Sequence, residues 1–341
     1  MQNTWYFNRG LSVKAREYFQ PFVLQTSNCS VPSATCVGKK IEPITSRGKF
    51  LTKLKVTNTK FDLDLLETIK NDCVNLIDLE LNFDYFDGNC YYEDFQNMTS
   101  LKTIILHNYL IEKYKINENE FMTCIPIGIE NIGIIKSKKK YRRACTPIFN
   151  CDFSRFTKLC KLRLDNWILS NNTMNSLEKF NETLTDLSLI DCIILKSGQA
   201  TIPKLTNLEN LDLLRVNIDD NVMINITHNC TKLYHLNISN CRKLTRTSLT
   251  TLKILRNLKE LFVNYLPNID DAVIKTISNL RIFKCKGCKL ITDYGVEKIV
   301  KKSPNLEELC ITDTGISSKT ISYPFKIRKV NIKVIPEDQQ K

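Results

Sequence analysis

The sequence has little of what enzyme active sites are usually built from. Its 341 residues include only three histidines and ten glycines. His107, His228 and His235 stand in no recognisable arrangement with a nucleophilic serine or cysteine. The sequence also lacks the Gly-x-x-x-x-Gly-Lys-Ser segment that cradles a phosphate. We therefore expect no enzyme activity and no cofactor.

Long apolar runs are also absent. No stretch approaches the roughly 20 apolar residues that a membrane-spanning helix needs. The first 20 residues carry charged and aromatic side chains without a continuous apolar segment, so we expect no cleaved secretory signal. The sequence predicts an intracellular protein, cytoplasmic or nuclear or both, that does not enter a membrane.

What the sequence does contain is a repeated Leu-x-x-Leu-x-Leu hexad with a period of about 25 residues. Clear copies are 76–81, 159–164, 184–189 and 208–213. Clear and degenerate copies together begin at positions 51, 76, 101, 129, 159, 184, 208, 233, 258, 280, 306 and 327. This pattern predicts about twelve repeats with a C-terminal capping strand over residues 49–335, an N-terminal cap over 1–48 and a disordered tail over 336–341.

The spacing within each repeat predicts a strand followed by a helix. The last two apolar residues of the hexad are two apart, which is the period of a strand. Apolar residues at helical spacing follow in 222–226, 273–277 and 296–300, each after a short polar pair that can begin a helix. Because one repeat cannot bury its own apolar edge, neighbouring repeats must stack. We expect an α/β fold, a right-handed solenoid shaped as a horseshoe, with parallel strands on the concave face and helices on the convex face.

Cysteine is frequent, with 14 in the chain. Five occupy equivalent places just after or just before a hexad, where a small apolar thiol fills a turn: Cys73, Cys192, Cys230, Cys241 and Cys288. The spread through the repeats favours reduced, packed thiols over a disulfide framework. Cys285 and Cys288 form the one Cys-x-x-Cys pair, but Cys285 stands at a leucine position, so we expect a core residue and no bound metal.

Segments 233–249, LYHLNISNCRKLTRTSL, and 280–296, LRIFKCKGCKLITDYGV, resemble the cysteine-containing class of leucine-rich repeat. Ser303-Pro304-Asn305-Leu306 resembles the Cys-Pro-x-Leu of that class, with serine in the cysteine position. The resemblance is strongest over about residues 158–320. It implies the repeat domain of an F-box substrate receptor or a repeat-only relative.

This resemblance implies a non-catalytic recognition module. The main expectation is a substrate receptor of an SCF-type ubiquitin ligase, a monomer within a larger complex that holds a client protein on its concave face. Its further partners would be the Skp adaptor and a cullin. The alternative is a ligase-independent scaffold or inhibitor that sequesters a signalling protein.

Residues 1–48 depart from the repeat. Trp5, followed by an aromatic residue and by Arg9, resembles the tail of an F-box module, whereas the Leu-Pro-x-Glu-like opening of such a module is missing from the sequence. We expect this segment to cap the first repeat, because an open solenoid end exposes core to water.

The residues that flank the hexad leucines are expected to project into the bowl of the horseshoe. Phe262 and Tyr265 should lie between His235 and Lys284. Exposed aromatics beside cations suit an interface anchor for an acidic or phosphorylated peptide, and an ordinary mixed surface is the alternative. The predicted partner-binding residues are Lys161, Arg163, His235, Asn237, Phe262, Asn264, Tyr265, Lys284 and Lys286.

A basic run falls in the longer fourth repeat of a chain whose net charge is +13. We expect an exposed loop that serves as a nuclear import signal, binds nucleic acid or is simply solvated. Acidic side chains predicted in the bowl, Asp78, Glu80, Asp186 and Asp212, would oppose phosphates and disfavour nucleic acid there. The run consists of Lys136, Lys138, Lys139, Lys140, Arg142 and Arg143.

Overall fold

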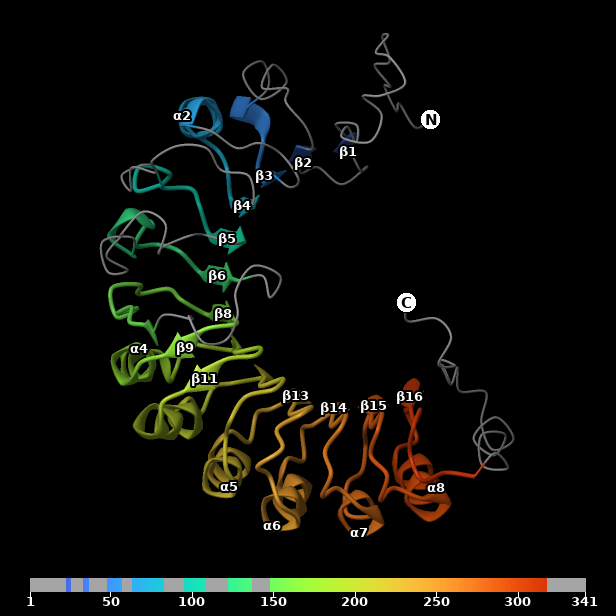
Figure 1. Ribbon diagram of the computed structural model, residues 1–341. Helices are drawn as coiled ribbons and strands as arrows, with labels where there is room; N and C mark the ends of the chain where they lie inside the picture. The colour runs from blue at the N-terminus through green and yellow to red at the C-terminus, as the bar shows by residue number, and fades with distance from the viewer. Residues whose placement is uncertain are drawn as a thin grey trace, which may run out of the picture.

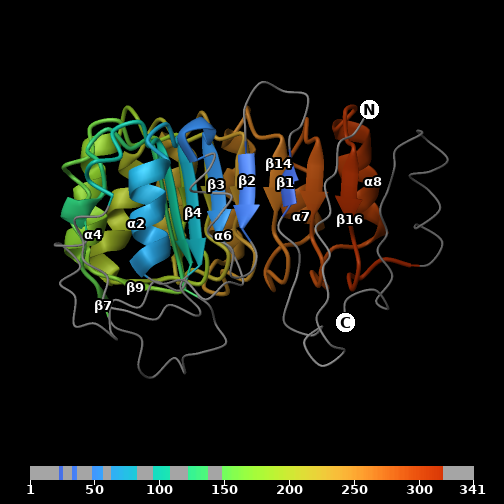
Figure 2. The ribbon, with the colours of Figure 1, turned by 90° about the horizontal axis from the view of Figure 1, so that it is seen from above.

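The computed structural model shows a curved solenoid in which the strands line the inner side and the helices the outer side (Figure 1). It describes residues 23–25, 33–36, 48–56, 63–82, 95–107, 122–136 and 148–317. Seen from above, the strands stand side by side along the arc (Figure 2). The horseshoe predicted from the hexads is therefore confirmed.

One 13-stranded sheet runs through the described residues. From β2 onward every neighbouring pair is parallel, and each strand pairs with the strand of the next repeat. The strands are β1 Val23–Gln25, β2 Ser33–Cys36, β3 Lys53–Val56, β4 Asp78–Asn82, β5 Thr103–His107, β6 Asn131–Ile135, β8 Lys161–Asp165, β10 Asp186–Ser188, β12 Asn210–Asp212, β13 His235–Asn237, β14 Glu260–Phe262, β15 Ile282–Lys284 and β16 Glu308–Cys310.

The hexads mark these strands closely. Each predicted hexad from residue 51 to residue 311 coincides with one strand, and its second apolar residue is buried. The hexad that begins at 327 and the tail over 336–341 lie outside the described residues. At the other end, β2 lies within the predicted N-terminal cap and extends the parallel sheet by one strand, and β1 pairs antiparallel with it.

The outer face is made of short helices, several of them 3₁₀ rather than α. This irregularity was not visible in the apolar pattern, which distinguishes poorly between the two in segments of four to nine residues. The helical segments are η2 Gly48–Phe50, α2 Leu63–Asp72, α4 Asn171–Ser176, η5 Leu177–Phe180, η6 Lys196–Lys204, α5 Asp220–Asn229, α6 Arg246–Leu249, η7 Thr250–Ile254, α7 Asp271–Ile274 and α8 Asp293–Lys302.

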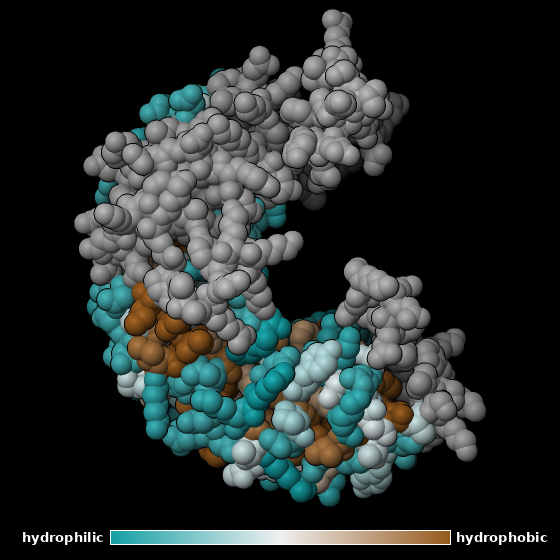
Figure 3. Space-filling model, viewed as in Figure 1, coloured by the Kyte–Doolittle hydropathy of each residue, from teal (hydrophilic) through white to brown (hydrophobic). Residues whose placement is uncertain are grey.

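A second, three-stranded sheet lies in the middle repeats, and in two of them its strands come directly before the helical segments α4 and η6. It joins β7 Ile148–Phe149, β9 Ile168–Leu169 and β11 Ile193–Ile194 in parallel. Ile148 and Ile193 are exposed on it. Figure 3 shows apolar residues gathered in the region where Figure 1 places β9 and β11.

The predicted helix starts are confirmed at α5, α7 and α8. The N-cap side chains of Asp219, Asp270 and Thr292 each accept a hydrogen bond from a backbone N–H of the first turn. The aspartate that follows each of these N-caps accepts hydrogen bonds from the next repeat instead. Asp220 accepts hydrogen bonds from the backbone N–H and hydroxyl of Thr245. Two later pairs of adjacent repeats are joined in the same way, by Asp271 with Thr292 and by Asp293 with Ser317.

The cysteines also join neighbouring repeats, within the core. The thiols of Cys192, Cys241 and Cys288 each donate to a backbone carbonyl of the preceding repeat, at 3.0, 3.0 and 3.1 Å. Ten cysteines of the described residues are free thiols, and all of them are buried except Cys160 and Cys310, which are partly buried. Burial raises the pKa of Cys241 to about 12 and that of Cys288 to about 11. The prediction of packed, reduced thiols is confirmed for these residues.

Candidate functional site

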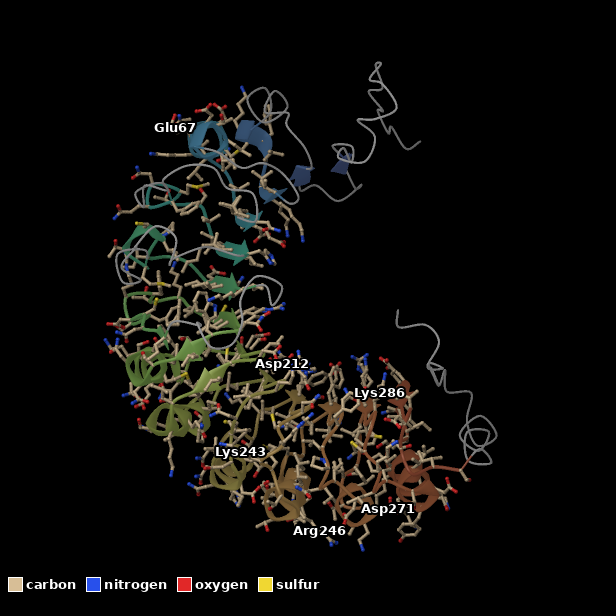
Figure 4. All side chains as sticks on the ribbon, in the orientation of Figure 1. Glu67, Asp212, Lys243, Arg246, Asp271 and Lys286 are labelled. Atoms are coloured by element: carbon tan, nitrogen blue, oxygen red, sulfur yellow. The ribbon has the colours of Figure 1, made fainter. Side chains whose placement is uncertain are left out.

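The concave face is the natural candidate site, because solenoids of this kind use that extended surface for binding. Along the central strands the hexad residue is buried and its two neighbours are partly exposed, as in β10, β12, β14, β15 and β16. Figure 4 shows Asp212 and Lys286 toward the hollow of the horseshoe, with Arg246 and Asp271 on its outer side. The predicted inward and outward positions are therefore correct for these strands.

Charges on this face are paired between adjacent strands. Near the N-terminal end, Lys53 lies 2.8 Å from Asp78, and Lys55 lies 2.7 Å from Glu80. The imidazole of His107 lies 2.8 Å from the same Glu80 carboxylate. Burial alone would raise the pKa of Glu80, but hydrogen bonds from Lys55 and His107 lower it below its usual value. The charged side chains in this part of the concave face therefore pair with one another.

The two basic residues predicted on β8 are also paired. Lys161 lies 3.5 Å from Asp186 on the next strand. Arg163 holds Asp165 of its own strand, with 2.7 Å between a guanidinium nitrogen and a carboxylate oxygen. Asp165 is buried, which raises its pKa, and the Arg163 guanidinium acts against that shift. These side chains lie on the concave face but are not free cations.

An aromatic cluster follows on β13, β14 and β15. The Phe262 ring meets the His235 ring edge to face, with 4.9 Å between ring centroids. The ammonium of Lys284 lies 4.7 Å from the centroid of the Phe262 ring and 3.0 Å from a carboxylate oxygen of Glu308. The structure thus brings together three of the predicted residues, His235, Phe262 and Lys284, which we call the concave aromatic patch.

A carboxylate shared between strands holds this patch in place, and it was missed in the sequence. Glu260 accepts hydrogen bonds from His235, at 3.0 Å, and from Arg281. Arg281 also pairs with Glu307 at 2.7 Å. Burial alone would raise the pKa of Glu260, but the hydrogen bonds from His235 and Arg281 lower it below its usual value. The sequence pattern did not reveal this role of Glu260, since its partners come from neighbouring repeats.

Two predicted contact residues are structural instead. Asn237 is 7% exposed, and its amide donates to Asp212 and accepts from the backbone N–H of Ser239. The amide oxygen of Asn264 accepts from the backbone N–H of Lys286, joining two repeats. The prediction that Asn237 offers surface to a partner is therefore corrected: a short amide beside a strand end satisfies backbone groups of the turn.

Tyr265 lies beyond the end of β14, in the turn that follows it. Its backbone is left-handed, with φ at +56°, and its side chain is 41% exposed. It lines a pocket with residues of the neighbouring turns, and neither His235 nor Lys284 lines that pocket. Tyr265 is thus separate from the concave aromatic patch.

The first residue of the basic run is not exposed. Lys136 is 6% exposed, and its ammonium lies 5.0 Å from the centroid of the Trp167 ring. The expectation that Lys136 belongs to an exposed loop is wrong, because the residue packs against the turn of the next repeat. Lys138, Lys139, Lys140, Arg142 and Arg143 lie outside the described residues.

The histidines are held by ordinary contacts. His107 and His235 pair with glutamates, and His228 bonds the carbonyl of Ile224 in its own helix. No cluster of three groups suited to a metal ion occurs in the part of the chain that the structure describes. Among the helices described, none has both the length and the apolar character to span a bilayer.

The stacked repeats define the class, together with the cysteine thiols that donate to the preceding repeat, which we call the cysteine ladder: the chain is a leucine-rich-repeat protein. In sequence it is similar to F-box/LRR-repeat protein 4 of Bos taurus, at 26% identity over 164 residues. That match covers 46% of this chain and 23% of the relative, so the chain spans less than a quarter of that protein's length. No family model matches the chain.

Two solved structures share the fold. An internalin from Listeria monocytogenes superposes with a TM-score of 0.53 at 17% identity, covering 86% of this chain and 76% of the internalin. Yeast Rad7, from its complex with Elc1, superposes with a TM-score of 0.50 at 17% identity, covering 82% of this chain and 75% of that one. At this identity the likeness concerns the solenoid alone.

Proposed function

We propose that this chain is the client-binding part of an SCF-type ubiquitin ligase. The observation that carries the proposal is the repeat itself. Its cysteine ladder places buried thiols against the preceding repeat, and its sequence is similar to an F-box/LRR-repeat protein over 46% of the chain. The yeast structure that shares the fold was solved as a complex of Rad7 with Elc1, which supports work within a larger assembly.

The concave aromatic patch is the proposed client contact. Phe262 supplies an aromatic surface whose position is set from both sides, by His235 and Lys284. Anchors of this kind carry much of the binding energy in protein interfaces when their surroundings hold them rigid. Because Glu308 already neutralises Lys284, the patch favours an apolar or aromatic client side chain over a purely acidic one.

In this function the chain positions a client and the ubiquitin chemistry belongs to partner subunits. Lys55, Lys161 and Lys284 on the concave face each pair with a carboxylate. The histidines there, His107 and His235, hydrogen-bond to glutamates and not to a serine or cysteine that they could activate. Residues 1–48 would contact the Skp adaptor, through the stretch that resembles the tail of an F-box.

Affinity purification from cells tests the proposal. The full chain and a chain without residues 1–48 would be tagged, and the Skp adaptor and cullin quantified by mass spectrometry. We expect both to be recovered with the full chain and lost with the shortened one. If neither is recovered with the full chain while other proteins are retained through the repeats, the ligase assignment is wrong.

A ligase-independent scaffold or inhibitor is the second candidate. One observation favours it: the concave aromatic patch is held rigid by contacts within this chain, so it can bind a partner without any ligase subunit. In that function the same concave patch would sequester a signalling protein. A stable complex that contains the client but neither adaptor nor cullin, with unchanged client turnover, would distinguish it from the receptor.

A further inference from the structure

A ridge of left-handed residues follows the strands from β8 to β16, one after each strand. Asparagine, aspartate and glycine tolerate this conformation, whereas bulky side chains adopt it rarely and at a cost. Arg215 is compensated by its ion pair with Asp191 in the neighbouring turn. Tyr265 is the remaining bulky residue. The ridge residues with positive φ are Asn166, Asp191, Arg215, Asn240, Tyr265, Gly287 and Asp313.

The neighbouring repeat is adapted to this tyrosine. Gly287 occupies the equivalent place one repeat on, and a Cβ there would lie 2.3 Å from Cδ1 of Tyr265. The ring therefore packs directly on the Gly287 backbone. The backbone N–H of Tyr265 donates to the carbonyl of Lys286 at 2.7 Å, which fixes the turn. An aromatic ring is thus held rigidly while two fifths of its surface stays in solvent, at 41% exposure.

This ring forms one wall of a pocket of about 450 Å³. Leu290 is 53% exposed there and offers apolar surface beside the ring. Lys289 pairs with Asp313, and Arg242 is exposed without a carboxylate partner in the described part of the chain. The lining residues are Arg242, Tyr265, Pro267, Gly287, Lys289 and Leu290, and no acid is among them.

We propose that this edge pocket binds an acidic segment of a partner protein. One apolar side chain of that segment would lie against Tyr265, Pro267 and Leu290, and a carboxylate beside it would pair with Arg242. A guanidinium binds a carboxylate through two parallel hydrogen bonds, which gives direction as well as attraction. Charge complementarity favours this occupant, since Arg242 lines the pocket without a carboxylate partner among the described residues and the whole chain carries a net charge of +13.

The edge pocket is distinct from the proposed client contact. On the concave face Lys161, Arg163 and Lys284 each have a carboxylate partner. Arg242 at the edge has none among the described residues. The acid selectivity that the sequence suggested for Lys284 therefore fits Arg242 better. The inference stands without the ligase assignment, because it concerns a different surface and needs no adaptor.

The test uses the full chain and a fluorescein-labelled peptide of 12 residues, in which aspartates flank one central phenylalanine. Fluorescence anisotropy would measure its affinity for the unchanged protein and for two pocket variants, Tyr265→Asn and Arg242→Glu. Asparagine tolerates the left-handed backbone, so Tyr265→Asn removes the ring without straining the turn. Matched controls are Tyr294→Asn and Lys253→Glu, which change an exposed tyrosine and an exposed lysine outside the pocket.

We expect saturable binding that either pocket variant weakens about tenfold or more, corresponding to about 1.4 kcal/mol, while the control variants bind as the unchanged protein does. Replacing the peptide's aspartates with asparagine, or its phenylalanine with serine, should weaken binding similarly. Absence of saturable binding would overturn the proposal. So would equal binding by the pocket variants, or displacement of the peptide by a single-stranded oligonucleotide that binds more tightly through Tyr265 and Arg242.

Discussion

The ring of His235 meets the ring of Phe262 edge to face, with 4.9 Å between the centroids. The two residues are 27 positions apart in the sequence, and the stacking of two repeats brings them together. Glu260, which is part of the same strand as Phe262, holds the imidazole of His235 from the other side. The aromatic surface is therefore positioned by its neighbours before any partner arrives.

Removing this surface should abolish client capture without affecting the fold. In the double variant Phe262→Ala and Lys284→Ala, we expect recovery of client proteins to fall at least about tenfold, as for an interface hot spot. Co-purification with quantitative mass spectrometry measures this, and circular dichroism checks the fold. Lys49→Ala with Phe50→Ala is the matched control, because it removes another lysine and phenylalanine in cation–π contact, 5.1 Å apart. Equal client recovery from both double variants would disprove the assignment.

Asp220, which follows the N-cap of α5, should stabilise the fold through its hydrogen bonds to the next repeat. Asp220→Ala removes hydrogen bonds to the N–H of Thr245, at 2.7 Å, and to the hydroxyls of Thr245 and Ser248. We expect the free energy of unfolding to fall by about 1–3 kcal/mol, measured by urea denaturation. Glu182→Ala, which replaces an exposed acid, should change it by less than about 0.5 kcal/mol. Comparable losses in both variants would show that the bond between repeats contributes little.

The buried thiols predict a loss of stability in alkali. Burial raises the pKa of Cys241 from 9.0 to about 12, so above pH 9 the unfolded chain releases a proton that the folded chain keeps. Unfolding then becomes easier as the pH rises toward 12. We expect Cys241→Ala to flatten the fall in unfolding free energy above pH 9 by roughly 1 kcal/mol per pH unit, with equal slopes below about pH 8. An unchanged slope above pH 9 would contradict the protonated, buried thiol.

Because the Tyr265 ring packs on Gly287, adding a single methyl group at position 287 should lower the stability of the fold. Gly287→Ala places a Cβ against the Tyr265 ring and puts alanine at a φ of +74°, so we expect about 1–3 kcal/mol of destabilisation, measured as a lower midpoint of thermal unfolding. Gly128→Ala is the control, since a Cβ there meets nothing within 4 Å. The double variant Gly287→Ala with Tyr265→Asn should recover part of the loss. No recovery would mean that backbone strain, not the ring, sets the cost.

The repeat pattern was sufficient to predict the strands and the curved sheet. Apolar residues two apart, recurring at a nearly constant period, leave few alternatives to stacked parallel strands, and each hexad from 51 to 311 is a strand. The cysteines were predictable for a similar reason, because a small apolar thiol at a repeated position signals a repeated buried turn. Helix type was harder, since short outer segments can bury the same residues as either α or 3₁₀ turns.

The repeat pattern specified the solenoid, its register and the alternation of buried and hollow-facing residues along the strands, because periodicity acts within one repeat and is copied by the next. Which side chains are available to a partner depends on how the repeats stack. Asn237 hydrogen-bonds to the backbone at the end of its strand, Lys284 is paired with Glu308, and Tyr265 lies on the edge beside Gly287. Each of these outcomes depends on a contact between residues more than 20 positions apart or on a turn conformation. Such contacts form when repeats stack, and no pattern within a single repeat specifies them.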